Sequence, residues 1–171
     1  TVYATTMADV IIGAFRRRPV GRKSTDGGRN WGAPIYPADI PINDSGWTTS
    51  RIAVLDDGTV ILSAPFSRDP KSIRIFRSTD AGQSFTTALV VPTTSRSIRS
   101  DLHAVTGSLT FLASFQASSA AGGELQVVRS GDGGLTFDAP QTIAPSNVAT
   151  TTRKRIARTA SGRWGIVWKD A

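Results

Sequence analysis

The sequence has no cysteine, a single histidine (His103) and a single glutamate (Glu124). Without cysteine the chain can form neither disulfides nor thiolate metal sites, and one histidine cannot supply several ligands to a metal. We therefore expect no metal and no cofactor. No apolar run reaches the ~20 residues that a membrane-spanning helix needs. The first residues have neither a basic segment nor a small-residue cleavage site, so we expect no signal peptide and no membrane.

Lysine and glutamate, both common in helices, are scarce: there are 4 Lys against 16 Arg, and one Glu against 12 Asp. This bias, with many Ser, Thr, Val, Ile and Gly, favours strands joined by turns. The net charge of +7 and the preference for Arg suit bidentate recognition of a carboxylate or phosphate, although a solvated basic surface would have the same composition. Charge alone would also allow nucleic acid, but no nucleic-acid-binding motif is present.

The 171 residues, about one domain, are organised as repeated units of short strands. In the clearest unit, the Asp-Gly turn at 56–59 separates apolar runs at 51–55 and 60–66, which is typical of a β-hairpin. Further runs at 72–78 and 85–91 complete a four-stranded antiparallel unit. Similar runs follow at 101–105, 109–115, 124–130 and 137–143, and half a unit at 155–168. In the first unit we expect strands at 2–6, 9–15, 20–24 and 31–36, with 2–6 innermost.

Three turns share one pattern: "RKSTDGGRNW" (22–31), "RSTDAGQSF" (77–85) and "RSGDGGLTF" (129–137). We call them the first, second and third Asp turns. They recur about every 50 residues, as structural units of a repeat fold do. Ser and Asp can accept hydrogen bonds from turn amides, Gly can supply a positive φ, and the aromatic can pack beneath the turn. We therefore expect structural roles for Ser24, Asp26, Gly28, Trp31, Ser78, Asp80, Gly82, Phe85, Ser130, Asp132, Gly134 and Phe137.

The pattern Ser-x-Asp-x-Gly-x-x-Trp/Phe resembles the Asp-box of bacterial neuraminidase (BNR) repeats, found in sialidases, sortilin-like receptor domains, other glycosidases and phage tail proteins. The resemblance covers nearly the whole chain and implies an all-β Asp-box β-propeller with four-stranded antiparallel blades. The units 1–44, 45–94, 95–147 and 148–171 then make about three and a half blades of a single partial propeller. Because a propeller must close, we expect a longer chain or further copies to complete the ring.

In this topology the Asp turns lie at one end of the blades, and the basic segments at 16–19, 67–71, 95–99 and 152–155 lie at the other, where they would attract an anion. Arg51, Asp101 and Arg155 open the innermost strands of successive units. "SRIA" at 50–53 resembles the Arg-Ile-Pro strand of sialidases, whose Arg binds the sugar carboxylate, although Ala53 stands in place of the Pro. The resemblance implies a substrate-binding role for Arg51, and we expect the same of Asp101 and Arg155 because they occupy equivalent positions; a common way of opening a strand would give the same letters.

The segment "SRDP" at 67–70 lies where sialidases keep their acid/base aspartate. The resemblance therefore implies Asp69 as a catalytic acid and Arg68 as a substrate-binding neighbour. A complete sialidase site also has a Tyr nucleophile paired with a Glu. The expected strands do not bring Tyr3 or Tyr36 near Glu124, so we expect incomplete catalysis in this chain.

The remaining candidate side chains each have a structural and a functional interpretation. Trp47, Trp164 and Trp168 could stack on a sugar ring, but such residues more commonly fill gaps between blades. His103 replaces an apolar residue of an inner strand, which is typical of a core histidine rather than a base.

Three functions stay open at this level. The first is a sialidase-like module that recognises an acidic glycan, or another anionic ligand, through its Arg-rich end. The second is a portion of an active exo-sialidase. The third is a structural or receptor-binding propeller such as a virion component. A secreted or surface-associated protein would suit each of them.

Overall fold

The computed structural model describes residues 1–11, 15–40, 46–68, 70–93, 96–119, 122–148, 154–159 and 161–168. These residues form twelve β-strands, paired into four antiparallel sheets that we number in chain order. The prediction of an all-β chain is confirmed. Nothing among the described residues is a helix capable of crossing a membrane.

The second and third sheets are four-stranded antiparallel meanders, as the turn pattern predicts. The second sheet contains β3 (Arg51–Val54), β4 (Val60–Phe66), β5 (Ser72–Ser78) and β6 (Thr86–Pro92). The third contains β7 (Arg96–Ala104), β8 (Phe111–Ser119), β9 (Gly122–Ser130) and β10 (Gln141–Val148). In both sheets an Asp turn follows the third strand.

The first and fourth sheets have two strands each within the described residues: β1 (Val2–Ile11) with β2 (Phe15–Ser24), and β11 (Lys154–Arg158) with β12 (Trp164–Trp168). The first sheet corrects one prediction. Residues 2–6 are not a separate innermost strand, because β1 runs through them and pairs with β2 along its whole length. No glycine or proline interrupts residues 2–11, so nothing breaks the strand there. Residues 31–36 contribute only the bridge between Gly21 and Ile35.

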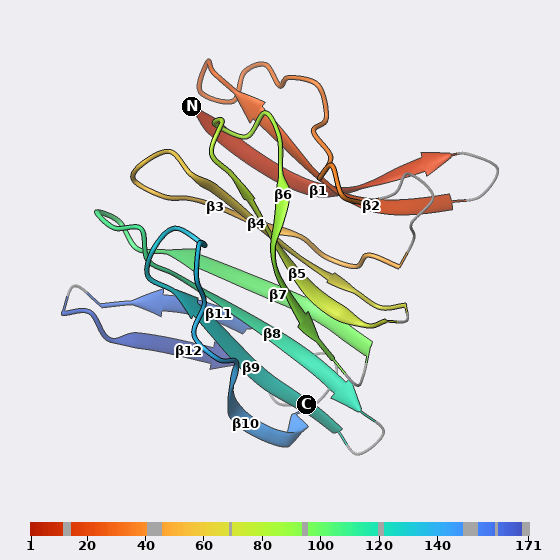
Figure 1. Cartoon of the computed structure of the whole chain (residues 1–171), viewed down its shortest axis with the longest axis vertical. Coiled ribbons are helices and arrows are strands. Elements are labelled where there is room, and N and C mark those ends of the chain that lie inside the picture. The colour runs from red at the N-terminus through yellow and green to blue at the C-terminus, as the bar shows by residue number, and fades with distance from the viewer. Residues whose placement is uncertain are drawn as a thin grey trace.

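The four sheets stack in chain order (Figure 1). The turns that join β3 to β4, β7 to β8 and β11 to β12 lie along the same side of the stack. Strand β7 contacts both β3 and β11, so the first strands of successive sheets lie next to one another. This stacking is consistent with propeller blades, and within the described residues the stack stays open rather than closing into a ring.

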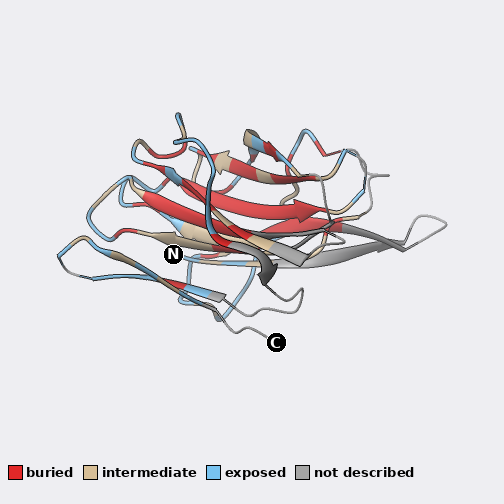
Figure 2. Ribbon diagram, turned by 90° about the horizontal axis from the view of Figure 1, so that it is seen from below, coloured by how far each residue is buried: buried red, intermediate tan, exposed pale blue. Residues whose placement is uncertain are grey.

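Strand alternation decides which neighbour each side chain packs on. Along β4, Val60 and Leu62 join the core shared with the first sheet, whereas Ile61 joins the core shared with the third sheet. Leu112 of β8 likewise packs toward Ile156 of the fourth sheet. Figure 2 shows buried residues running along the strands and exposed residues gathered in the connecting turns. Apolar side chains on both faces of a sheet are thus buried by a sheet on each side.

Candidate functional site

The Asp turns are held by one repeated set of hydrogen bonds. In the second turn, the Ser78 hydroxyl donates to Asp80 Oδ1 at 2.6 Å and accepts from the Gly82 amide at 2.8 Å. The amides of Gln83 and Ser84 donate to the same carboxylate oxygen, each at 2.9 Å. Equivalent bonds tie Ser24 to Asp26 and Gly28 in the first turn, and Ser130 to Asp132 and Gly134 in the third. Each carboxylate therefore acts as a brace for its own turn.

A further member of each turn was missed by the sequence reasoning. The side chain just before the aromatic donates to the second carboxylate oxygen: Asn30 Nδ2 to Asp26 at 2.7 Å, and the hydroxyls of Ser84 and Thr136 to Asp80 and Asp132. The sequence did contain a pattern at this position, which is a small polar residue with a hydrogen-bond donor in all three turns. The pattern was overlooked because the three residues, Asn30, Ser84 and Thr136, are of different types.

These bonds hold the carboxylates in their ionised form. The amide of Asn30, with help from the side chains of Ser24 and Asn30, lowers the pKa of Asp26 to about 2. Hydrogen bonds from Ser78 and Ser84 push the pKa of Asp80 well below its usual range, and Thr136 does the same for Asp132. A carboxyl group that stays ionised to such low pH is poorly suited to donate a proton near neutrality.

Backbone geometry explains the glycines of the turns. Residues one and two positions after each Asp have positive φ, for example 74° at Gly133 and 83° at Gly134. Ala81 is the one non-glycine residue with positive φ among those described, at 56°. Glycine adopts this region at little cost, which is why the pattern nearly always places it there.

The second and third Asp turns also reach back to the preceding sheet. The Tyr3 hydroxyl on β1 donates to the Ala81 carbonyl of the second turn at 3.1 Å. Arg77 Nε on β5 donates to the Gly133 carbonyl of the third turn at 2.7 Å. The two accepting carbonyls occupy the same position, one residue after the Asp. The turns therefore join neighbouring sheets as well as closing their own hairpins.

The aromatic residues of the turns differ in burial. Phe85 is 1% exposed in the core shared with the first sheet, and its ring approaches Gly21 of β2. Phe137 packs edge-on against Phe111, with ring centroids 5.9 Å apart. Trp31 departs from the expectation, because it is 39% exposed. The aromatics pack toward the preceding sheet, and the first sheet of the stack has none before it in the described residues.

The arginine end is built on the first strands of the sheets. Arg51, Asp101 and Arg155 lie opposite Ser63, Ser114 and Val167 on the neighbouring strands, which are corresponding positions of three successive sheets. Arg51 Nε forms an ion pair with Asp101 Oδ1 at 3.4 Å. The Arg51 side chain is 41% exposed and the Asp101 side chain 12%. The structure thus brings two of the three predicted residues into contact, and Arg155 is exposed at the equivalent place.

The other predicted members of this site are less informative. Arg68 is exposed and its aliphatic part lies over Gly46. Asp69, the predicted catalytic acid, lies outside the described residues. The side chains of the basic segments at 16–17, 96–98 and 154 lie outside the description as well.

Trp47, Trp164 and His103 lie between sheets. Trp47 is 2% exposed and packs on Phe66 with ring centroids 4.8 Å apart, in the core between the first and second sheets. Trp164 is half-buried and meets His103 edge-on at 5.7 Å. The side chain of Trp168 lies outside the described residues. Packing between sheets accounts for Trp47 without a ligand.

Tyrosine and glutamate do not come together among the described residues. Both tyrosines belong to the first sheet and its following segment, where Arg18 lies 4.6 Å over the Tyr36 ring. Glu124 lies on β9 of the third sheet and accepts from the Gln126 amide at 3.1 Å. Burial, with a contribution from Asp80, raises the pKa of Tyr3, which opposes its use as a nucleophile. The same described residues contain no group of three or more potential metal ligands.

The antiparallel sheets are stacked, and Asp turns bind neighbouring sheets to one another. These features define a propeller-like all-β protein. No family model matches the sequence, and no curated protein does. Among solved structures, the chain is similar to a protein of unknown function from Dyadobacter fermentans DSM 18053, with a TM-score of 0.55 and 16% identity over 96% of this chain and 51% of that one.

The chain is also similar to a point mutant of the NanB sialidase from Streptococcus pneumoniae, with a TM-score of 0.60 and 12% identity over 89% of this chain and 23% of that one. The chain therefore spans about half the length of the first structure and less than a quarter of the second. At these identities the likeness concerns the fold, which is sialidase-like.

Proposed function

We propose that this chain is a sialidase-like module of the Asp-box propeller type that binds an acidic glycan through the arginines at the start of its first strands. The proposal is supported above all by the geometry of Arg51. Its Nε is held by Asp101, and one terminal nitrogen donates to the Ser50 carbonyl at 3.0 Å. These two contacts fix the plane of a partly exposed guanidinium, and a fixed guanidinium binds a carboxylate at a smaller entropic cost.

The charge balance around Arg51 also favours an anion. Asp101 neutralises one positive charge, and Arg155 adds another at the equivalent position of the fourth sheet. Two arginines and one aspartate at these three positions favour the approach of a carboxylate. An acidic sugar is the ligand class that joins this chemistry to the sialidase-like fold.

We propose binding rather than turnover for the chain as it stands. A retaining sialidase needs a tyrosine and a glutamate within hydrogen-bond reach, and the described residues hold them on different sheets. Asp69 stays a proposed acid that rests on the motif alone. A fluorogenic sialoside should therefore show no turnover; measurable release would support the exo-sialidase alternative instead.

The binding test compares sialylated glycans with their desialylated forms at physiological salt. We expect preference for the sialylated forms and a loss of ~10-fold or more in Arg51→Ala, because a charge-assisted hydrogen bond is worth about 1.5–3 kcal/mol. Arg163→Ala is the matched control, since Arg163 is equally cationic and exposed but lies in the turn between β11 and β12. Equal losses in both variants, or no preference for acidic glycans, would contradict the proposal.

A further inference from the structure

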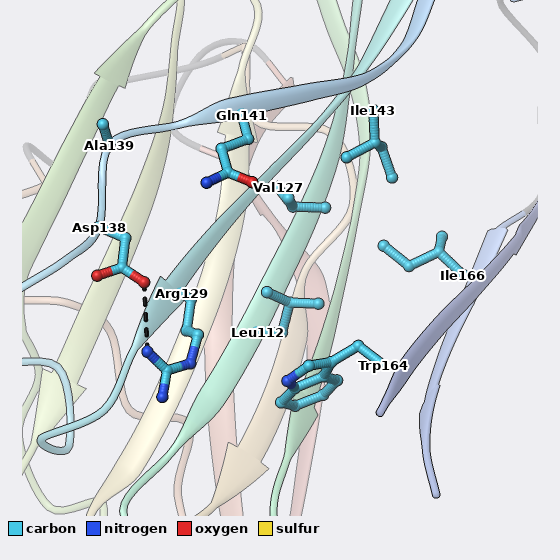
Figure 3. A pocket seen from close by; sticks show the side chains of 9 residues that line it. All are labelled: Leu112, Val127, Arg129, Asp138, Ala139, Gln141, Ile143, Trp164 and Ile166. Atoms are coloured by element: carbon cyan, nitrogen blue, oxygen red, sulfur yellow. Dashed lines mark hydrogen bonds and ion pairs between the residues drawn. The ribbon is translucent and has the colours of Figure 1, made fainter. Parts of the chain in front are cut away.

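A pocket of about 390 Å³ opens between the third and fourth sheets (Figure 3). Leu112 of β8 and Arg129 of β9 line one side of it, and Trp164 and Ile166 of β12 line the other. Asp138, Ala139, Gln141 and Ile143 border it further. Asp138 pairs with Arg129 at 3.3 Å. We call this the β9–β12 pocket.

Strand register shows which residues correspond to this lining in the second sheet. Leu112 lies opposite Arg129, just as Ile61 lies opposite Arg77. Each arginine directly precedes the serine of an Asp turn, and each apolar partner faces the following sheet. The two pairs therefore occupy the same place in successive sheets.

The third lining residue has a counterpart as well. Trp164 opens β12 opposite Arg158, and Phe111 opens β8 opposite Ala104. Both aromatics pack toward the preceding sheet. Leu112, Arg129 and Trp164 in the β9–β12 pocket thus correspond to Ile61, Arg77 and Phe111.

Those three counterparts hold the third Asp turn. A Cβ atom placed on Gly134 would lie 3.3 Å from Ile61, 3.5 Å from Phe111 and 3.6 Å from Arg77. Arg77 also donates to the Gly133 carbonyl. The turn therefore fits tightly between two sheets, and glycine is needed for its closest approach.

The second Asp turn is held in the same manner one sheet earlier. A Cβ atom on Gly82 would lie 2.8 Å from Tyr3 and 3.8 Å from Val60. Tyr3 occupies the register position of Ile61, opposite Lys23, and Val60 occupies that of Phe111. Two of the three positions thus contact an Asp turn at both sheet junctions, and at the earlier junction Tyr3 donates the hydrogen bond that Arg77 donates at the later one.

We infer that the β9–β12 pocket is a third site of this kind, and that it binds a strand–turn segment with the Asp-turn pattern. The strand of this segment would pair with the open edge of β12, because β12 pairs only with β11 among the described strands. Its turn glycine would pack on Leu112 and Trp164. Arg129 would release its ion pair with Asp138. It would instead donate a hydrogen bond to a backbone carbonyl of the segment, that of the residue directly after the segment's Asp, as Arg77 does to Gly133.

The partner is a segment whose strand edge is free, and a second folded copy of this chain does not meet that requirement. The strand before each Asp turn is already paired on the edge that β12 would need: β2 with β1, β5 with β4, and β9 with β8. The binding chemistry is therefore an alternating apolar strand followed by the pattern Ser-x-Asp-x-Gly-x, a small polar residue and an aromatic.

A labelled synthetic peptide that copies residues 122–140 of this chain tests the inference by fluorescence polarisation. We expect saturable binding to the intact protein. A peptide carrying Gly134→Val should bind at least 10-fold more weakly, because valine fits neither the positive φ nor the close approach. In the protein, Arg129→Met should weaken binding several-fold, whereas Arg51→Ala and Arg163→Ala should leave it unchanged. Retained binding in Arg51→Ala separates this site from the glycan site of the proposed function.

The Arg129 side chain is 47% exposed, so its replacement should leave the fold intact, which circular dichroism checks. Hydrogen exchange should slow at β12 when the unlabelled peptide is added, as expected for a newly paired strand edge. Equal affinity of the wild-type and Gly134→Val peptides would overturn the inference. So would an absence of saturable binding to folded protein, or displacement of the peptide by an acidic sugar, which would make the pocket a carbohydrate site.

Discussion

The hydroxyl of Ser63 on β4 donates to the hydroxyl of Ser100 on β7 at 3.1 Å, and both residues are buried. The same relationship joins Thr5 of β1 to Ser50 at 2.8 Å. Thr5 and Ser63 occupy one register position, and Ser50 and Ser100 directly precede Arg51 and Asp101. One hydroxyl pair is therefore repeated between successive sheets, alongside the bonds from the Asp turns.

Breaking this pair on one side should cost more than removing it entirely. Ser100→Ala leaves a buried Ser63 hydroxyl without its partner, so we expect a loss of about 1–3 kcal/mol in the free energy of unfolding. The double variant Ser63→Ala/Ser100→Ala should lose less than the two single losses added together. Urea denaturation of the four proteins measures this, and strict additivity would show that the two hydroxyls are not coupled.

Gly82 should tolerate no side chain. Gly82→Ala combines a positive φ of 76° with a Cβ only 2.8 Å from Tyr3 Cε1, so we expect a loss of about 2–4 kcal/mol. Gly58→Ala is the matched control, because its φ is 83° but no atom lies within 4 Å of the added Cβ. It should lose only about 1–2 kcal/mol. Similar melting temperatures for the two variants would mean that the approach to Tyr3 is unimportant.

Two aromatics at the same motif position should respond differently to truncation. Phe85→Ala removes a ring that is 1% exposed, and we expect a loss of about 3–5 kcal/mol. Trp31→Ala removes one that is 39% exposed and should change stability by about 1 kcal/mol or less. Thermal unfolding of both variants tests this directly. A large loss in Trp31→Ala would indicate that the first sheet is covered in solution.

The Asp turns should make stability fall in acid. Folding lowers the pKa of Asp26, Asp80 and Asp132, so their contribution is complete above the ordinary aspartate value of about 4. It is lost as the pH falls through the lowered values. We expect a nearly constant melting temperature from about pH 7 to 5 and a decline below about pH 4. Asp80→Asn should be less stable at neutral pH and decline less steeply; a decline parallel to that of the natural chain would contradict this.

Local features of the fold could be predicted from the sequence. The hairpin at 51–66 and the four-stranded second and third sheets follow from alternating apolar residues and an Asp-Gly turn, which act within a few residues. The strand at 2–11 was divided because the repeat period suggested a fourth strand where no turn residue interrupts the chain. The local signal was the better guide there.

Relationships between sheets could not be predicted in the same way. The unequal burial of Trp31 and Phe85 depends on whether a sheet lies in front of the turn, and the motif letters are the same in both cases. The Arg51–Asp101 pair was foreseen only as two equivalent positions, because an ion pair between sheets depends on how side chains cross the gap. The hydrogen bonds from Tyr3 and Arg77 to the Asp turns of the next sheets could not be predicted from a sequence pattern, since two different residue types donate the equivalent bond.

Because the second and third Asp turns each bind the sheet before them, the structure has a direction along the chain. A gene that duplicates or deletes one whole unit would still give each remaining turn a sheet to bind, whereas a break within a unit would separate a turn from its own hairpin. Changes in length during evolution should therefore occur in steps of about 50 residues, the size of one repeat.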